Sequence, residues 1–186
     1  MPKKKDRFTL RAREEGYQAR SAYKLKEINK EFSIIKSGYN VLDLGCSPGG
    51  WSQIALEAVG PQGSVMGVDD MPVRIQAKNF EFIHADIFEF YPDRVFDVVI
   101  SDMAPRTTGQ RQLDQERSYQ LSLRALAIAK KNLRTGGSFL VKIFQGPNYE
   151  AFLLKVKNSF GYSKTVKPKA SKSDSKEMYV LGKNKK

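Results

Sequence analysis

The sequence is poor in the residues that build disulfides and metal sites. Its 186 residues include one cysteine, Cys46, and one histidine, His84. A single cysteine cannot form a disulfide within the chain, which excludes a disulfide-stapled secreted fold and favours a reducing compartment, the cytoplasm. No Cys/His cluster has the spacing of a zinc site, so we expect no metal and predict structural roles for Cys46 and His84.

Long hydrophobic runs are absent as well. No stretch approaches the ~18 consecutive apolar residues of a membrane helix, and residues 1–7 (MPKKKDR) lead into no apolar segment of a signal peptide. We therefore expect no membrane partner. The length and the 40% content of hydrophobic residues fit a single domain over 1–186, with a basic N-terminal extension and helix over 1–36 and the main core over 37–186. A monomer is the default expectation.

Acidic residues are scarce at both ends of the chain. The formal net charge is +12, and residues 1–36 hold 11 basic and 5 acidic side chains while residues 151–186 hold 10 and 2. A near-neutral body with two basic flanks predicts a track for a polyanion, most often nucleic acid, beside a separate pocket. The terminal lysine clusters 3–5 and 183–186 are expected to be frayed. The side chains expected to contact the polyanion are Lys3, Lys4, Lys5, Arg7, Arg11, Arg13, Arg20, Lys164, Lys167, Lys169, Lys172 and Lys176.

Short apolar runs and helical patterns alternate along the chain. Alternation of this kind predicts an α/β fold, with a mostly parallel sheet that helices cover on both faces. The loop expected before the last strand spans 167–176. The predicted strands are 40–44, 64–68, 80–84, 95–101, 138–143, 162–166 and 178–181. The clearest predicted helices are 16–32, 118–133 and 149–160.

A glycine-rich turn follows the first predicted strand, in the segment 41–51 (VLDLGCSPGGW). In an open parallel sheet, ligands bind outside the carboxyl ends of the strands near such a turn. This turn has neither the G-x-G-x-x-G spacing of a dinucleotide site nor the lysine of a phosphate-binding loop. The sequence therefore disfavours a bound pyrophosphate.

Acidic residues occur at successive strand ends. They would form one rim suited to a cationic ligand that carries a ribose, such as S-adenosylmethionine. The alternative is that each acid only caps the helix that follows it. The residues concerned are Asp43, Asp69, Asp70, Asp86 and Asp102.

Five ordered segments of the chain resemble one known family. They are 21–25 (SAYKL), 43–45 with 48–53, 101–105 (SDMAP), 137–146 (GSFLVKIFQG) and 167–179. On these segments the chain resembles the FtsJ/RlmE-type ribosomal RNA 2′-O-methyltransferases. The resemblance implies the Rossmann-like fold of S-adenosylmethionine-dependent methyltransferases. It further implies S-adenosyl-L-methionine as cofactor, large-subunit (23S-type) ribosomal RNA as partner, and methylation of a ribose 2′-hydroxyl, at a uridine. Naked RNA and RNA within the large ribosomal subunit both stay open as the substrate.

The same resemblance implies the site residues. It assigns a catalytic group to Lys24, Asp102, Lys142 and Glu177. Asp43 and Gly45, in the first strand and its turn, complete the predicted cofactor site. For Trp51, a buried role as a core aromatic is equally compatible with the sequence. The cofactor contacts that the resemblance assigns are Gly49, Trp51, Asp69, Asp86 and Asp102.

The chemistry of 2′-O-methylation explains why such residues would be needed. A ribose hydroxyl is a weak nucleophile, so it must be aligned with the methyl group and its proton must be removed or stabilised. Lys142 follows an apolar run and could act as a base if neutral, or orient the hydroxyl if Asp102 keeps it charged; both roles stay open. Glu177 is expected where the last strand enters the sheet, orienting Lys142 or the ribose. Tyr17 and Tyr23 could stack a base, although packing is the more common use.

Other functions share these features. A 2′-O-methyltransferase acting on transfer RNA or an mRNA cap would need the same catalytic group. A nucleic-acid-binding module that has lost catalysis would keep the fold without needing the four catalytic residues. A methyltransferase for small molecules or proteins would fit the pocket but leave the basic ends of the chain unexplained.

Overall fold

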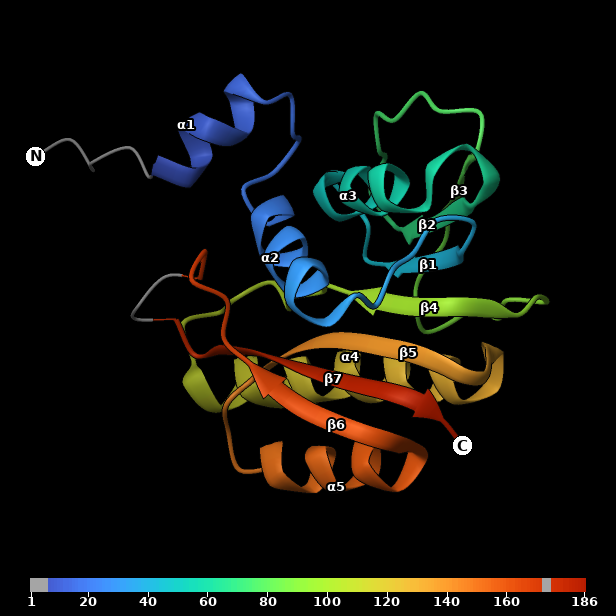
Figure 1. The fold of residues 1–186 in the computed structure, drawn as a ribbon. Helices are drawn as coiled ribbons and strands as arrows, with labels where there is room; N and C mark the ends of the chain where they lie inside the picture. Colours follow the sequence, from blue (N-terminus) through green and yellow to red (C-terminus); the bar gives the residue numbers. More distant parts are fainter. Residues whose placement is uncertain (1–6, 172–174) are drawn as a thin grey trace, which may run out of the picture.

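Buried apolar runs form a seven-stranded sheet with helices on both faces in the computed structural model, which describes residues 7–171 and 175–186 (Figure 1). The strand order is β3-β2-β1-β4-β5-β7-β6. Neighbouring strands from β3 to β5 pair in parallel, and β7 pairs antiparallel with β5 and β6. The predicted α/β fold is confirmed. The strands are β1 (Asn40–Leu44), β2 (Ser64–Asp69), β3 (Phe80–His84), β4 (Phe96–Ser101), β5 (Leu133–Phe144), β6 (Phe160–Val166) and β7 (Glu177–Lys185).

Two hydrophobic layers hold the helices on the sheet. On one face, Leu25 and Trp51 pack with the strand residue Ile100. On the other, Leu126 and Phe152 pack with residues such as Val99. In Figure 1, α2 and α3 therefore lie on one side of the sheet and α4 and α5 on the other. The helices are α1 (Arg7–Glu14), α2 (Ala22–Phe32), α3 (Gly50–Val59), the 3₁₀ turn η1 (Gly60–Gln62), α4 (Arg111–Asn132) and α5 (Tyr149–Ser159). No helix among the described residues is long and apolar enough to cross a membrane.

The single helix predicted over 16–32 is wrong in its first part. Gly16 adopts a φ of +78°, and α2 begins only at Ala22. The side chain of Gln53, on α3, accepts a hydrogen bond from the Gln18 amide at 2.8 Å and donates one to the Gly16 carbonyl at 3.0 Å. These tertiary bonds satisfy backbone groups that a continuous helix would have paired internally. Sequence periodicity could not reveal them.

The lysine cluster at 183–186 is not frayed, contrary to prediction. Residues 183–185 belong to β7. The Lys183 ammonium donates to the Phe32 carbonyl at 3.0 Å, and the Lys185 ammonium donates to the Leu133 carbonyl at 2.5 Å. The long lysine stems lie along the fold while their amines satisfy carbonyl groups at the ends of helices. The other predicted frayed cluster, 3–5, lies outside the described residues.

Two further boundaries differ from the prediction by several residues. The helical pattern expected to start at 118 begins at Arg111, and β5 begins at Leu133 instead of 138. Leu133 is the last residue of the apolar helical pattern, yet it has extended φ and ψ angles of −82° and 141°. It pairs in register with Phe96 of β4. Sheet pairing therefore overrides the helical pattern at this residue.

Candidate active site

The carboxyl ends of the parallel strands and the start of β7 meet at one edge of the sheet. Lys142 lies near the end of β5, and Asp102 follows β4 directly. Because β7 runs antiparallel to β5, its first residue, Glu177, pairs in register with Phe144 at the end of β5. Lys24 reaches the same edge from the first turn of α2, where its side chain is only 9% exposed. The fold thus brings together all four predicted catalytic residues.

Lys142 is held by two oxygens of Asp102. Its ammonium donates to the Asp102 carbonyl at 2.5 Å and lies 3.1 Å from Asp102 Oδ1. The Lys142 side chain is only 5% exposed. A buried ammonium of this kind needs a nearby anion to offset its desolvation, which Asp102 provides. The ammonium thus donates one hydrogen bond to the Asp102 carbonyl and forms an ion pair with the Asp102 carboxylate, and an ammonium with three N–H donors can also donate to a substrate oxygen.

Glu177 pairs with Lys24 instead of Lys142. The Lys24 ammonium donates to Glu177 Oε2 at 2.9 Å. Burial raises the pKa of Glu177, but the hydrogen bond from Lys24 and the positive charges of Lys24 and Lys142 outweigh burial and leave the pKa lowered. Glu177 is therefore ionised at neutral pH. The predicted position at the start of the last strand is confirmed, and its direct hydrogen-bond partner is the lysine of α2.

Tyr179 connects these two ion pairs, a link that the sequence reasoning missed. Its hydroxyl donates to Asp102 Oδ1 at 2.7 Å, and the Lys24 ammonium lies 5.5 Å from the centre of its ring. Burial, and then the charge and hydrogen bond of Asp102, raise the pKa of Tyr179 far above its usual value, so the hydroxyl stays a donor. Alternation along a strand was the available signal, because it places residues 177 and 179 on one face of β7.

A cavity of about 500 Å³ adjoins this network. Its wall includes Gly45, whose φ is +73° and where an added Cβ would collide with the side chain of Met103. Glycine is thus required for the backbone to border the cavity. Four carboxylic acids line the same cavity: Asp69, Asp70, Asp86 and Asp102.

Two of these acids are fixed by backbone amides. Asp69 accepts hydrogen bonds from the amides of Ser47 at 2.9 Å and Met71 at 2.8 Å. Burial is the largest effect on the pKa of Asp69 and raises it, against the lowering effect of these two bonds. Asp86 accepts a bond from the Phe88 amide at 2.8 Å. The acids therefore line the cavity in set positions, and in neither case is a following helix capped.

The cavity fits S-adenosylmethionine in size and in chemistry. Its volume is within the usual range for small-molecule sites, roughly 300–1,000 Å³. Carboxylates suit a ligand that carries a sulfonium, an ammonium and ribose hydroxyls, because they stabilise cations and accept hydrogen bonds. Of the predicted cofactor residues, Gly45, Asp69, Asp86 and Asp102 line this cavity.

Three other predicted cofactor residues are buried and are not among the residues that line this cavity. Asp43 is fully buried, and its Oδ2 accepts a hydrogen bond from Ser52 at 2.6 Å. Burial raises the pKa of Asp43 to about 7. Gly49, with a φ of +122°, precedes α3. Trp51 is 2% exposed, donates its indole N–H to the Ser21 carbonyl and stacks on Tyr179 at 5.6 Å. Trp51 is therefore a core aromatic that supports Tyr179, and cofactor contact by these three residues stays a prediction.

Cys46 and His84 have structural surroundings. Burial raises the pKa of the Cys46 thiol well above its usual range, which makes it a poor nucleophile. His84 Nε2 lies 2.9 Å from the Asp70 carbonyl. Within residues 7–171 and 175–186, no cluster of His, Cys, Asp and Glu is arranged to hold a metal ion.

The two basic ends of the chain meet in the fold. Arg20 donates to the Ala170 carbonyl at 2.6 Å, and the Lys169 amide donates to Glu27 at 3.0 Å. Tyr23 packs in the small core that joins these segments, with Ala12 and Ala170, so it is a packing residue. Arg11 and Lys164 form ion pairs with Glu15 and Glu31. Of the predicted basic contacts, Lys3, Lys4, Lys5 and Lys172 lie outside the described residues.

Comparison with known proteins gives one consistent family. The sequence-family model of the FtsJ-like methyltransferases matches residues 17–185 of this chain. A curated relative from Oleidesulfovibrio alaskensis, named ribosomal RNA large subunit methyltransferase E, is 46% identical over an alignment of 191 positions, which covers 98% of this chain and 92% of the relative. A protein of the same name from Neisseria gonorrhoeae is 42% identical over an alignment of 189 positions, which covers 97% of this chain and 91% of the relative.

Solved structures agree with the fold. One from Plasmodium falciparum, named as a ribosomal RNA methyltransferase, has a TM-score of 0.81 and 26% identity, covering 91% of this chain and 98% of its own. Fibrillarin from Aeropyrum pernix, solved with bound S-adenosyl-L-methionine, has a TM-score of 0.62 and 18% identity, covering 87% and 76%. The likeness to fibrillarin concerns the fold alone.

Proposed function

Because this chain belongs to the FtsJ-like methyltransferase family, we propose that it uses S-adenosyl-L-methionine to methylate a ribose 2′-hydroxyl of large-subunit ribosomal RNA. The proposed target is a uridine in 23S-type RNA, within or before assembly of the large ribosomal subunit. We further propose that the enzyme acts as a monomer in the cytoplasm.

One observation carries the proposal. Lys24, Asp102, Lys142 and Glu177 come from four separate elements, yet two ion pairs and the hydroxyl of Tyr179 join them beside a cavity lined by acids. Placing two lysines and two acids in so little solvent costs free energy unless they are paired. Such a cluster at the ligand-binding edge of a parallel sheet is typical of an active site.

The residues of the chain have separable tasks in this reaction. The bound cofactor supplies an electrophilic methyl group on a sulfonium. Asp102 fixes the position of the Lys142 nitrogen through a hydrogen bond to its carbonyl and an ion pair with its carboxylate, so another N–H of Lys142 can hold the 2′-oxygen in line with the methyl group. As the oxygen bonds to the methyl group, the bond between that methyl group and sulfur breaks and the hydroxyl proton passes to solvent water, while the same ammonium stabilises the negative charge that develops on the oxygen.

Lys24 and Glu177 complete the electrostatics of the site. Glu177 keeps the Lys24 ammonium at the strand edge, and Tyr179 holds the Asp102 carboxylate by a hydrogen bond. The two lysines and two acids together carry no net charge. A hydroxyl can therefore enter without an uncompensated charge, while single cations remain available close to its oxygen.

The basic ends support RNA as the substrate. Segments near both ends of the chain lie against each other, joined by Arg20 and Lys169, so part of the positive charge of one end lies beside part of that of the other. Phosphate contacts made by such side chains position an RNA without reading its sequence. The curated relatives named for ribosomal RNA methylation span almost the whole of this chain, including both of these segments.

Methyl transfer to defined RNAs tests the proposal. Purified enzyme is given labelled S-adenosylmethionine with unmodified large ribosomal subunits, free ribosomal RNA, transfer RNA or capped mRNA, and products are identified as nucleosides by mass spectrometry. We expect 2′-O-methyluridine from the large subunit or its RNA. Methyl groups on a base, or on transfer RNA or the cap only, would contradict the proposed substrate. Lys131→Ala, on the exposed last turn of α4, serves as a control that keeps full activity.

A further inference from the structure

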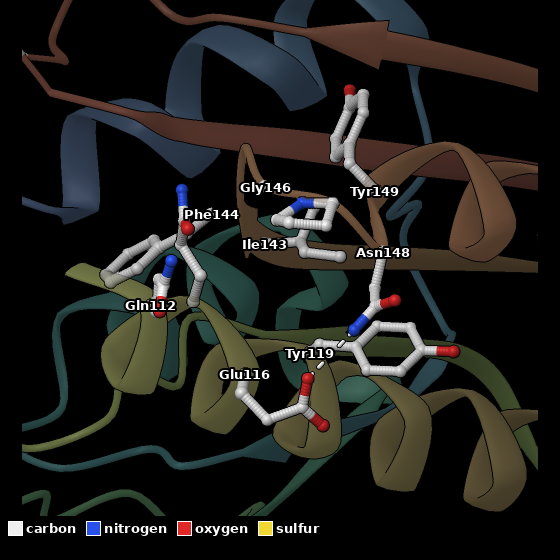
Figure 2. Close-up of a pocket in the computed structure, with 10 residues that line it drawn as sticks. Gln112, Glu116, Tyr119, Ile143, Phe144, Gly146, Asn148 and Tyr149 are labelled. Atoms are coloured by element: carbon white, nitrogen blue, oxygen red, sulfur yellow. Dashed lines mark hydrogen bonds between the residues drawn. The ribbon is translucent and has the colours of Figure 1, made fainter.

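A second cavity lies close to the catalytic residues, between the first half of α4 and the loop that joins β5 to α5 (Figure 2). Its volume is about 300 Å³, and it shares no lining residue with the acidic cavity. Phe144 lines it, two residues beyond Lys142 on β5 and paired in register with Glu177. The cavity therefore borders the point where both catalytic strands reach the edge of the sheet.

The lining of this second cavity contains neither lysine nor arginine. It combines the aromatic rings of Tyr119 and Phe144 with the amides of Gln112 and Asn148. One carboxylate, Glu116, is also present. A site for phosphate would need cations, whereas flat rings and side-chain amides are the groups that bind unstacked nucleobases.

Hydrogen bonds fix the polar side chains of this second cavity and leave some of their donors and acceptors free to bind a ligand. Asn148 Nδ2 donates to Glu116 Oε2 at 2.8 Å, the bond drawn in Figure 2, where the ring of Tyr119 lies beside it. Gln120 donates to the other oxygen of Glu116 at 2.7 Å. The amide of Asn148 is thus oriented, while its Oδ1 makes no hydrogen bond within the described part of the chain. The side chain of Gln112 makes none there either.

The size of the cavity limits its occupant. About 300 Å³ is the lower end of the usual range for small-molecule sites, which is enough for one planar ring system. The backbone of Gly146 packs closely on the side chain of Gln115, since an added Cβ would lie 3.0 Å from it. Because Phe144 lines this cavity, lies two residues beyond Lys142 and is paired with Glu177, a base held here would belong to a nucleotide near the reacting ribose.

We infer that this second cavity receives one nucleobase of the RNA, from a nucleotide next to the one that is methylated. The base stacks against the aromatic wall, and its edge is read by Asn148 Oδ1 and the amide of Gln112. This inference rests on the proposed function and adds a source of target choice to it. The phosphate contacts of the basic ends give binding strength, and this base contact selects the position along the strand.

The test is a comparison of two asparagine variants on two kinds of RNA. Asn148→Ala removes the oriented amide, and Asn158→Ala, at the exposed far end of the same helix, is the matched control. Both are assayed on an RNA fragment that carries the mapped target, and on fragments with an abasic site at each neighbouring nucleotide in turn. Thermal unfolding and the KM for S-adenosylmethionine are measured in parallel.

We expect Asn148→Ala to lower kcat/KM for intact RNA by about 5- to 100-fold, the usual value of one base contact. The KM for S-adenosylmethionine and the unfolding temperature should match those of Asn158→Ala. One abasic fragment should lower the wild-type rate to that of Asn148→Ala and leave the variant unchanged, because the contact is already lost. Equal rates for the two variants on intact RNA, or a full Asn148→Ala defect on every abasic fragment, would overturn the inference. A wild type that methylates no RNA would instead refute the proposed function.

Discussion

The hydroxyl of Tyr179 and the ammonium of Lys142 share one oxygen, Asp102 Oδ1, at 2.7 Å and 3.1 Å. Lys142 and Tyr179 are also directly opposite each other in the pairing of β5 with β7. The register of two antiparallel strands therefore sets the geometry of the acid between them. A slip of one strand by one residue would turn its side chain to the other face of the sheet, so Lys142 and Tyr179 would no longer share a face.

The shared oxygen predicts the effect of Tyr179→Phe. The variant keeps the ring that stacks on Trp51 but loses the hydrogen bond that fixes Asp102. We expect kcat to fall by about tenfold, because one hydrogen bond to a charged group contributes about 1.5 kcal/mol. The affinity for S-adenosylmethionine, measured by calorimetry, should stay within about twofold, since lost orientation acts on the chemical step. Tyr39→Phe is the control, because Tyr39 directly precedes β1, at the edge of the sheet away from the site. An unchanged kcat in Tyr179→Phe would show that the hydrogen bond to Asp102 has no part in catalysis.

The Lys24–Glu177 pair should be strongly coupled. A double-mutant cycle with Lys24→Met and Glu177→Gln, followed by denaturant unfolding at pH 7, measures the coupling. We expect about 1–3 kcal/mol, because each single change leaves a partly buried charge unpaired. The Arg94–Glu81 pair has the same 2.9 Å distance but is about half exposed, so its cycle should give less than about 1 kcal/mol. Similar coupling in the two pairs would contradict this account of the buried one.

Asp43 should make stability depend on pH. Its pKa is raised from 3.8 to about 7 in the folded protein, mainly by burial. Between these values the folded state binds more protons than the unfolded state, so this residue makes the free energy of unfolding fall as pH rises through that window. Asp43→Asn removes this dependence while keeping an acceptor for Ser52.

The corresponding measurement is urea unfolding at pH 5 and pH 8. Relative to the wild type, Asp43→Asn should be more stable at pH 8 than at pH 5. Asp93→Asn is the control, because the Asp93 side chain is 93% exposed and should leave the pH dependence of the wild type in place. An Asp43→Asn protein with the same pH dependence as the wild type would mean that Asp43 is already ionised across this range.

The basic ends should control the salt dependence of RNA binding. Each lost phosphate contact reduces the slope of log affinity against log salt by about 0.7–0.9. We expect this change for Arg13→Gln in α1 and for Lys169→Gln in the loop before β7, measured by filter binding between about 50 and 200 mM salt. Lys131→Gln, on the last turn of α4, should keep the wild-type slope. Identical slopes for all three variants would place the RNA elsewhere.

Much of the fold followed from the sequence because burial on both faces of a parallel sheet leaves continuous apolar runs. The strands 40–44 and 80–84 have the predicted bounds. The sequence could not show that Gln53 would stop a helix at 16–21, because that interaction spans residues far apart in the chain. For the same reason, it could not show that Lys183 and Lys185 are held in place by the carbonyls of Phe32 and Leu133.

The candidate site was predictable to a similar depth. The family resemblance supplied Lys24, Asp102, Lys142 and Glu177, and the sequence reasoning paired Asp102 with Lys142, as the structure does. It placed Glu177 on Lys142 or the ribose, whereas Glu177 pairs with Lys24. That pairing depends on the register of β5 with β7, and so does the link through Tyr179. Trp51 lies within the segment that resembles the family's cofactor motif, yet its indole N–H donates to the Ser21 carbonyl and its ring packs in the core against Tyr179.

The most direct test of the central claim is the single-turnover rate of methyl transfer by Lys142→Ala on unmodified large ribosomal subunits, with S-adenosylmethionine binding confirmed by calorimetry. The account predicts a fall of about 10²- to 10⁴-fold in the rate of 2′-O-methyl formation, with cofactor affinity and RNA affinity close to those of the wild type. A Lys142→Ala enzyme that forms 2′-O-methyl groups within about tenfold of the wild-type rate would contradict it, because the nitrogen that two oxygens of Asp102 hold in place would then have no part in the chemistry.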